Sequence, residues 1–258
     1  MTSLPPARCC TIGSLHEGEP KGELKNIGNI STVAKALAAI VSTYFAYPPD
    51  KSTENAILIL SDVIGHKFVN AQLIADEFAA NGYFVVLPDL FEGDTVPLNR
   101  PEGFQIQDWL KNHLPQHVEP IIDAVLAELR GPLGVKRVGG VGYCFGGRYV
   151  ARYLRPGTGK IDVGYTAHPT MMSPEELAGI QGPFSIAAAT EDFVFTTEKR
   201  RESEDILAKL GQPYQMNLFS HVNHGFSVRC DMSVKEQKIA KEAAFAQAVQ
   251  WFDSYLKE

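Results

Sequence analysis

The sequence has few cysteines, no excess of basic residues and no long hydrophobic run, and each absence excludes a class of protein. Its 258 residues include four cysteines, whose positions do not form the spacing of a disulfide framework. Lysine and arginine together number 24 against 30 aspartates and glutamates, so we expect no nucleic-acid partner. No apolar run approaches the roughly 20 residues that a membrane-spanning helix needs, so we expect no membrane partner either.

The same shortages bear on the compartment and on metal binding. The first ten residues lack an apolar core of signal-peptide length, so we predict a cytoplasmic protein with free thiols. Cys9 and Cys10 are adjacent, but no Cys-x-x-Cys or paired His-Cys spacing accompanies them, and we assign them an ordinary structural role. The seven histidines also lack the spacing of zinc ligands. We therefore expect no metal and no cofactor.

Short apolar runs alternate with amphipathic segments along the chain, which is typical of an α/β protein with a mostly parallel central sheet and helices on both faces. Continuous apolar stretches at 56–60 and 83–87 predict strands that are buried on both faces. Further strands are expected at 41–47, 135–141, 161–167, 184–189 and 214–219, and helices at 70–81, 105–130, 148–154, 199–210 and 233–257. Pro115 and Pro120 are expected to start or divide segments of the helical region 105–130. The length favours a single domain over residues 1–258, with residues 1–30 packed on it as an N-terminal extension.

The segment Gly142-Tyr143-Cys144-Phe145-Gly146 matches the pattern of a nucleophile elbow, with cysteine in place of serine. A predicted strand precedes this segment and helical spacing follows it, as the sharp strand-turn-helix geometry requires. Glycines on both sides of the nucleophile leave room where the strand and the helix pass close together. Cys144 is therefore the candidate nucleophile, and the alternative is a buried structural cysteine in a glycine-rich turn.

Two further polar residues follow predicted strands later in the chain. Asp192 comes after the strand 184–189 and His224 after the strand 214–219, which gives the order nucleophile, acid, histidine. This is the order of the triad in the α/β-hydrolase fold, which we therefore predict. An imidazole activates a thiol by accepting its proton, and a carboxylate holds the imidazole in the required tautomer.

Three other histidines, at positions 66, 168 and 221, are candidates for a place near the site. His221 competes with His224 as the base, and the Gly-Phe sequence that follows His224 favours His224. His66 and His168 also follow predicted strands. We expect His66 to line the mouth of the site and His168, which precedes a proline, to have a structural role.

These motifs resemble the dienelactone hydrolase family, in particular its fungal members. The similarity covers nearly the whole chain, and its most specific parts are the cysteine elbow and the His-Gly-Phe motif. Further similar segments lie at residues 61–67, 82–83, 88–91, 191–192 and 224–229. The resemblance implies an enzyme that opens the ring ester of dienelactone, with Cys144 as nucleophile, His224 as base and Asp192 as the orienting acid.

The resemblance also implies roles for residues around the triad. The backbone N–H groups of Val63 and Phe145 would form the oxyanion hole. A carboxylate after an early strand touches the resting thiol in the family, and here it is Asp62, which is shorter than the glutamate of bacterial members. Arg229 takes the place of one of the two arginines that bind the substrate carboxylate in bacterial members. Residues 91–94 contain no second arginine.

The sequence therefore predicts a carboxylic ester hydrolase that cleaves a small ester or lactone through a thioester acyl-enzyme. An alternative from another class is a non-catalytic or repurposed member that binds a small carbonyl compound. A peptidase is a weaker alternative, because no segment indicates an extended groove. We expect a small-molecule substrate and a monomer or homodimer.

Overall fold

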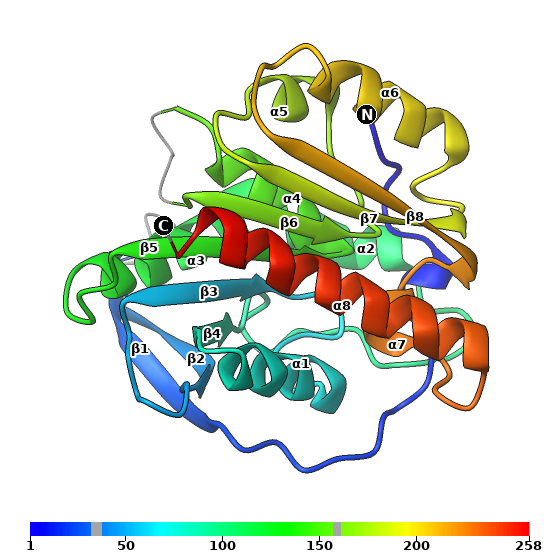
Figure 1. Ribbon diagram of the computed structural model, residues 1–258. Coiled ribbons are helices and arrows are strands. Elements are labelled where there is room, and N and C mark those ends of the chain that lie inside the picture. Colours follow the sequence, from blue (N-terminus) through cyan, green and yellow to red (C-terminus); the bar gives the residue numbers. More distant parts are fainter. Residues whose placement is uncertain (32–37, 157–160, 258) are drawn as a thin grey trace.

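The computed structural model describes residues 1–31, 38–156 and 161–257. In these ranges the chain forms an eight-stranded sheet in the order β1-β2-β4-β3-β5-β6-β7-β8 (Figure 1). β2 is antiparallel to both of its neighbours, and every other neighbouring pair is parallel. The strands are β1 (Glu23–Ser31), β2 (Ala38–Ala46), β3 (Asn55–Leu60), β4 (Phe84–Pro88), β5 (Arg137–Tyr143), β6 (Val163–Ala167), β7 (Phe184–Glu191) and β8 (Tyr214–Asn223). Residues 32–37, 157–160 and 258 of the predicted single domain lie outside the described residues.

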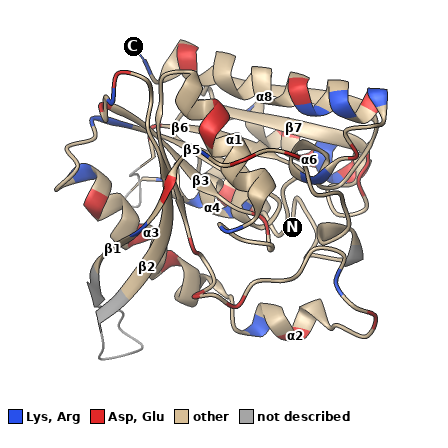
Figure 2. Cartoon of the chain, turned by 90° about the horizontal axis from the view of Figure 1, so that it is seen from below, with Lys and Arg blue, Asp and Glu red and all other residues tan. Residues whose placement is uncertain are grey.

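Helices cover both faces of the sheet, which confirms the predicted arrangement. The helices α1 (Val69–Ala80) and α8 (Lys235–Tyr255) pack on one face, and α3 (Pro115–Arg130) and α4 (Phe145–Tyr153) pack on the other (Figure 1). Figure 2, turned by 90°, shows the sheet between α8 and α3. The shorter helical elements are η1 (Arg8–Cys10), α2 (Ile106–Lys111), α5 (Pro174–Ala178), α6 (Thr197–Leu207) and α7 (Phe226–Arg229).

The helical region 105–130 contains one departure from the sequence-based prediction. Pro115 starts α3, at a position where a missing N–H costs no helical hydrogen bond. Pro120, however, lies inside α3 and does not divide it. A proline in a helix interior costs about 3 kcal/mol, whereas burial of one large aliphatic side chain contributes roughly 1.5–3 kcal/mol. Several such side chains of α3 are buried, including Ile122, Val125 and Leu129, and their burial outweighs the cost of the proline.

The N-terminal segment, residues 1–14, runs along the edge of the sheet where the parallel strands end (Figure 1). The Ser3 N–H donates to the backbone oxygen of Met172, in the loop after β6, at 3.1 Å. The Ser14 N–H donates to the backbone oxygen of Arg229, which follows β8, at 2.9 Å. Because α/β sheets place ligands beyond the carboxyl ends of their strands, this segment lies over the expected position of the active site.

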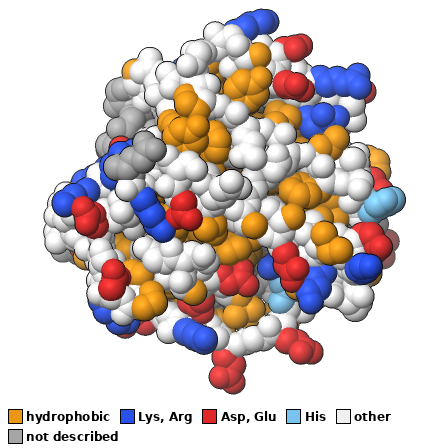
Figure 3. All heavy atoms as spheres, viewed as in Figure 1, with side chains coloured by type: hydrophobic (Ala, Val, Ile, Leu, Met, Phe, Trp, Pro, Cys, Tyr) orange, Lys and Arg blue, Asp and Glu red, His pale blue; other side chains and the backbone are white. Residues whose placement is uncertain are grey.

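The surface of the molecule is mixed in character. Figure 3 shows acidic and basic side chains interspersed with apolar ones on the face that carries α8, with no single basic patch on that face. Among the described residues, no helix combines the length and the hydropathy that a membrane span requires.

Candidate active site

Cys144 occupies a sharp turn between β5 and α4, as the elbow motif predicts. Its backbone has φ 51° and ψ −108°, which is a strained conformation for a residue with a side chain. A Cβ atom at Gly146 would lie 1.9 Å from the backbone oxygen of Leu60, and one at Gly142 would lie 2.6 Å from the Cα of Gly147. Only glycine fits at these two positions, because backbone atoms already occupy the space.

Asp192 and His224 meet at the same edge of the sheet. His224 Nδ1 lies 2.9 Å from Asp192 Oδ2 and 3.1 Å from Asp192 Oδ1. Asp192 Oδ1 also accepts the backbone N–H groups of Val194 and Phe195, at 2.8 and 2.9 Å. The carboxylate is thus fixed by its own loop and orients the imidazole through Nδ1, which leaves Nε2 free to face a third group.

The third group is a pair of sulfur atoms. One nitrogen of the His224 ring and the Sγ atoms of Cys144 and Cys10 all lie within 4.8 Å of one another. His224 Nε2 is buried and has no hydrogen-bond partner among the described residues, so it is available to exchange a proton with a thiol. All three side chains are buried, and the cluster is therefore shielded from bulk water.

The electrostatics of the cluster favour a charged imidazole. Burial alone would lower the pKa of His224, but the nearby Asp192 carboxylate and the Cys10 sulfur outweigh this effect and raise the pKa well above its ordinary value. The pKa of Asp192 is lowered: burial would raise it, and the charge and hydrogen bond of His224 outweigh that effect. The charged imidazole and the charged carboxylate therefore stabilise each other.

The candidate oxyanion-hole residues lie on two connected turns. Val63 belongs to the turn after β3, and Phe145 is the first residue of α4. The Gly146 N–H donates to the backbone oxygen of Ser61 at 3.2 Å, which holds the two turns together beside Cys144. Within the described ranges, neither the Val63 nor the Phe145 N–H donates to another backbone oxygen.

Asp62 and Arg229 contact each other. Asp62 Oδ1 accepts the Ile64 N–H at 3.0 Å, and Asp62 Oδ2 accepts Arg229 Nη1 in a buried ion pair. The carboxylate is therefore engaged by groups other than the Cys144 thiol, which the resemblance had indicated as its partner. Arg229 also donates to the backbone oxygens of Ile12 and Cys9, each at 3.3 Å, so the N-terminal segment covers its guanidinium.

The structure distinguishes the other candidate histidines. His221 is exposed on β8, whereas His224 faces Asp192. His168 is buried with its ring 5.0 Å from that of His224, and its Nε2 lies 2.7 Å from Ser227 Oγ. Burial, with smaller contributions from the charges of His224 and Arg229, lowers the pKa of His168 well below its ordinary value, so this ring stays neutral. His66 is 1% exposed, and its Nε2 lies 2.9 Å from Ser42 Oγ.

Cys10 is the residue of the cluster that the sequence did not indicate. The sequence predicts an ordinary structural role for it, yet it lies beside Cys144 and His224. No spacing rule connects residue 10 to residue 144, and the contact arises only because the N-terminal segment crosses the carboxyl edge of the sheet.

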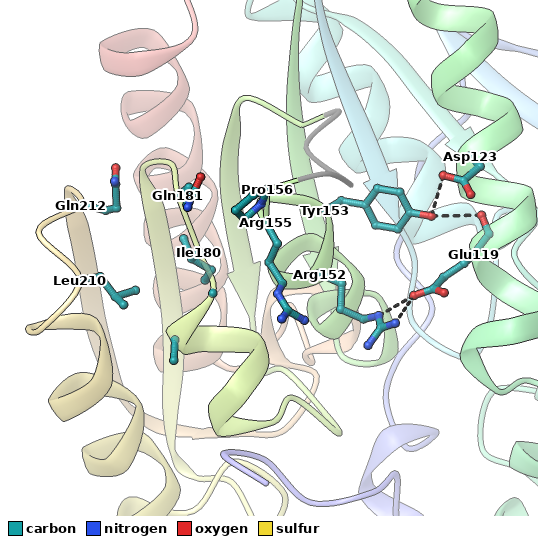
Figure 4. A pocket seen from close by; sticks show the side chains of 12 residues that line it. Glu119, Asp123, Arg152, Tyr153, Arg155, Pro156, Ile180, Gln181, Leu210 and Gln212 are labelled. Atoms are coloured by element: carbon teal, nitrogen blue, oxygen red, sulfur yellow. Dashed lines mark hydrogen bonds and ion pairs between the residues drawn. The ribbon is translucent and has the colours of Figure 1, made fainter.

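A cavity of about 840 Å³ lies away from this cluster (Figure 4). It is lined by residues near the C-terminal end of α4 and before β7 and β8, at the edge of the sheet where strands begin. The Tyr153 hydroxyl, which lines it, lies 3.1 Å from both the backbone oxygen of Glu119 and the carboxylate of Asp123. None of the three triad candidates lines this cavity, and the opposite edge is where α/β folds place their chemistry.

The strand order is that of an α/β-hydrolase, and the elbow carries a cysteine. Asp192 and His224 follow the last two strands, as the acid and the histidine do in that fold. The family model described as "Dienelactone hydrolase family" matches residues 41–256. The chain belongs to the dienelactone hydrolase family, whose members are carboxylic ester hydrolases, and this confirms the family and the enzyme class expected from the sequence.

Individual relatives are similar along their whole length. "Hydrolase pyvD" from Aspergillus violaceofuscus is 56% identical over 258 residues, which cover 100% of both chains. "Dienlactone hydrolase 1" from Gibberella moniliformis is 31% identical over 261 residues, which cover 98% of this chain and 95% of that protein. The crystal structure of dienelactone hydrolase from Anabaena variabilis has a TM-score of 0.63 at 14% identity, covering 91% of this chain and 99% of that one. At that identity the match supports the fold alone.

Proposed function

We propose that this protein hydrolyses a small ester or lactone through a thioester formed on Cys144. The observation that carries the proposal is the orientation of His224. Its Nδ1 is held by Asp192, and its unpartnered Nε2 is buried in a cluster with the thiol of a residue on a strained elbow. This arrangement supplies a nucleophile, a base and an orienting acid in the roles that acyl transfer needs.

The proposed reaction has two stages. The Cys144 thiolate attacks the substrate carbonyl, and the resulting oxyanion accepts hydrogen bonds from the N–H groups of Val63 and Phe145. The C–O bond breaks, His224 donates its proton to the departing alkoxide, and a thioester remains. Water then attacks the thioester while His224 accepts its proton, which releases the carboxylic acid and restores the thiol. For a lactone, the alcohol and the acyl group belong to one molecule, so the product is a single hydroxy acid or its keto form.

The relatives suggest which substrate to test first. The Gibberella protein is named a dienlactone hydrolase, so dienelactone and related ring esters are the leading candidates. Arg229 is the candidate for binding a substrate carboxylate, since its planar guanidinium matches two carboxylate oxygens. Its present partners are Asp62 and two carbonyl oxygens of the N-terminal segment. These contacts use one N–H each on Nε, Nη1 and Nη2, so a substrate anion would bind the other N–H groups of the guanidinium or displace one of these partners.

Steady-state turnover of a chromogenic short-chain ester and of dienelactone tests the proposal. Cys144→Ala should lose hydrolysis of both compounds, and Cys230→Ala serves as the matched control because Cys230 is buried outside the catalytic cluster. Mass spectrometry of Asp192→Asn during turnover should show an acyl adduct on Cys144, since weaker base catalysis slows its hydrolysis. Undiminished turnover in a folded Cys144→Ala variant would refute the proposal, and binding without turnover in the wild type would support the repurposed, non-catalytic alternative.

A further inference from the structure

Cys10 and Cys144 are 134 positions apart in the chain (144 − 10), yet both sulfurs belong to one buried cluster with His224. The proposed hydrolysis uses Cys144 and leaves Cys10 without a role. A second buried thiol within 4.8 Å of a nucleophilic thiol is a chemically distinct feature, because two thiols at this range can be joined.

The position of Cys10 is fixed by contacts on both sides. Cys10 closes the short helix η1, and its Sγ accepts the Ala7 N–H at 3.3 Å. On the other side, the Thr11 backbone oxygen accepts the Asn99 N–H at 2.7 Å. Arg229 donates to the backbone oxygen of Cys9 at 3.3 Å, which ties η1 to the buried ion pair. The thiol is therefore held inside the cluster by the fold of the N-terminal segment.

The surroundings of the two sulfurs favour oxidation of this pair over the other thiols. Two cationic groups, the His224 imidazole and the Arg229 guanidinium, interact with the cluster, and cysteines with such neighbours are the ones that react readily with peroxides. In contrast, a hydrogen bond to Cys10 together with burial raises the pKa of the Cys9 thiol. Burial raises the pKa of Cys230 to about 11. Both of these residues stay protonated and react slowly.

We propose that Cys10 is the resolving thiol of Cys144 and that a peroxide converts the pair into a disulfide. In the first step the Cys144 thiolate attacks one peroxide oxygen, the O–O bond breaks, and the other oxygen leaves as hydroxide or alkoxide. Cys144 is now a sulfenic acid. The Cys10 thiol then attacks this sulfur, the S–O bond breaks and water leaves. The two thiols lose two electrons and two protons in total. Hydrogen peroxide is thereby reduced to two molecules of water, and an alkyl hydroperoxide to one water and one alcohol.

The bond requires only a local movement. The sulfurs must approach from within 4.8 Å to about 2.05 Å. The helix η1 has three residues and is not part of the sheet, so we infer that rotation about the Cα–Cβ bonds and a shift of η1 bring the sulfurs together. The product has no free nucleophile, and its N-terminal segment is covalently attached across the site. Reduction by a dithiol restores both thiols, so the disulfide protects Cys144 from irreversible oxidation to the sulfinic acid.

Peptide mapping of the full-length protein after mild hydrogen peroxide treatment tests the inference. In the sample analysed without reduction, we expect a disulfide cross-link between the peptides that contain Cys10 and Cys144. The linked peptides should be about 2 Da lighter than the sum of the two free peptides, and dithiothreitol should reverse the change. Cys9→Ser should give the same cross-link, which identifies the bonded member of the adjacent pair. In Cys10→Ser the cross-link should disappear, and Cys144 should gain about 32 Da as the sulfinic acid, which dithiothreitol does not remove.

Three results would overturn the inference: a cross-link that persists in Cys10→Ser, one that disappears in Cys9→Ser, or no cross-link in the wild type while Cys144 is overoxidised. Circular dichroism of each variant checks that it is folded. The mass readout does not depend on hydrolysis, so a cross-link without any esterase activity would remove the proposed function and leave this inference in place. Absence of the cross-link in a protein that hydrolyses esters normally would refute this inference and leave the proposed function in place.

Discussion

Arg229 and Asp62 form an ion pair in which each side chain is 1% exposed, beside the cluster of Cys10, Cys144 and His224. Arg229 Nη1 donates to Asp62 Oδ2, Nη2 donates to the backbone oxygen of Cys9, and Nε donates to that of Ile12. A buried ion pair contributes little net stability compared with apolar residues, but removal of one partner leaves an uncompensated charge. The pair therefore connects the turn after β3, the helix α7 and the N-terminal segment.

Arg229→Met should lower the free energy of unfolding by about 3–5 kcal/mol, because the Asp62 carboxylate is left buried without its partner. Urea unfolding followed by circular dichroism measures this change. The double variant Asp62→Leu/Arg229→Met should lose less than the sum of the single variants, with a coupling of about 1 kcal/mol or more. Strictly additive effects would show that the two charges do not depend on each other.

Gly146→Ala should be severely destabilising, by about 3 kcal/mol or more, and should abolish hydrolysis. The added Cβ would lie 1.9 Å from the backbone oxygen of Leu60, and backbone atoms there cannot move aside without distorting β3. Gly28→Ala is the matched control, since a Cβ at Gly28 meets nothing within 4 Å, and we expect a change within about 0.5 kcal/mol. Thermal unfolding of both variants measures the difference, and a stable, active Gly146→Ala would contradict the elbow geometry.

The His224–Asp192 pair should make stability depend on pH. Burial opposes the charged imidazole, but Asp192 and Cys10 raise the pKa of His224 well above 6.5. A raised folded-state pKa contributes stability that is complete below the unfolded value and is lost as pH rises through the folded value. In Asp192→Asn the part of this contribution that comes from the Asp192 carboxylate disappears. The free-energy difference between wild type and variant should therefore be largest below pH 6.5 and should shrink as pH rises through the raised folded-state pKa of His224.

Denaturant unfolding at several pH values gives these differences, and NMR titration of the His224 ring protons reports its pKa directly. Parallel stability curves for the two proteins across this range would mean that Asp192 does not hold the charge of His224. The pKa of Asp192 is itself lowered from 3.8, so its own contribution should persist until pH falls below that value.

Asn99→Gly should make Cys144 more accessible. The Asn99 side chain accepts the Gly13 N–H at 3.1 Å and donates to the Gly13 oxygen at 3.0 Å, which fastens the N-terminal segment. Asn99 has φ 52°, so glycine fits its backbone without strain. Loss of about 1 kcal/mol of this attachment should raise the rate of Cys144 alkylation by iodoacetamide roughly fivefold.

Asn81→Gly is the control for this experiment, because the Asn81 side chain donates to the backbone oxygen of Glu77 at the end of α1. Its alkylation rate at Cys144 should equal that of the wild type. An equal rate in Asn99→Gly as well would show that the attachment of Gly13 does not limit access to the thiol.

The sequence predicted those parts of the structure that depend on local patterns. Local sequence is sufficient to predict β3, β4 and the Gly-x-Cys-x-Gly elbow, because burial and close approach restrict which residues fit there. Asp192 and His224 could be chosen because each follows a strand. Cys10 and the partner of Arg229 could not, because their contacts join distant segments, and neither has a pattern in its own neighbourhood. Pro120 was misjudged because the burial of α3 outweighs the cost of one proline.

The path of the N-terminal segment changes how binding constants of this enzyme are to be read. Cys144 and His224 are buried beneath it, so a substrate that reacts at Cys144 as proposed must compete with the segment, which then acts as a tethered competitive ligand. The apparent affinity of any substrate is then its intrinsic affinity reduced by the fraction of molecules in which the segment has moved aside. A compound that gains contacts with the displaced segment recovers this loss, so selectivity is decided partly by residues that never touch the reacting carbonyl.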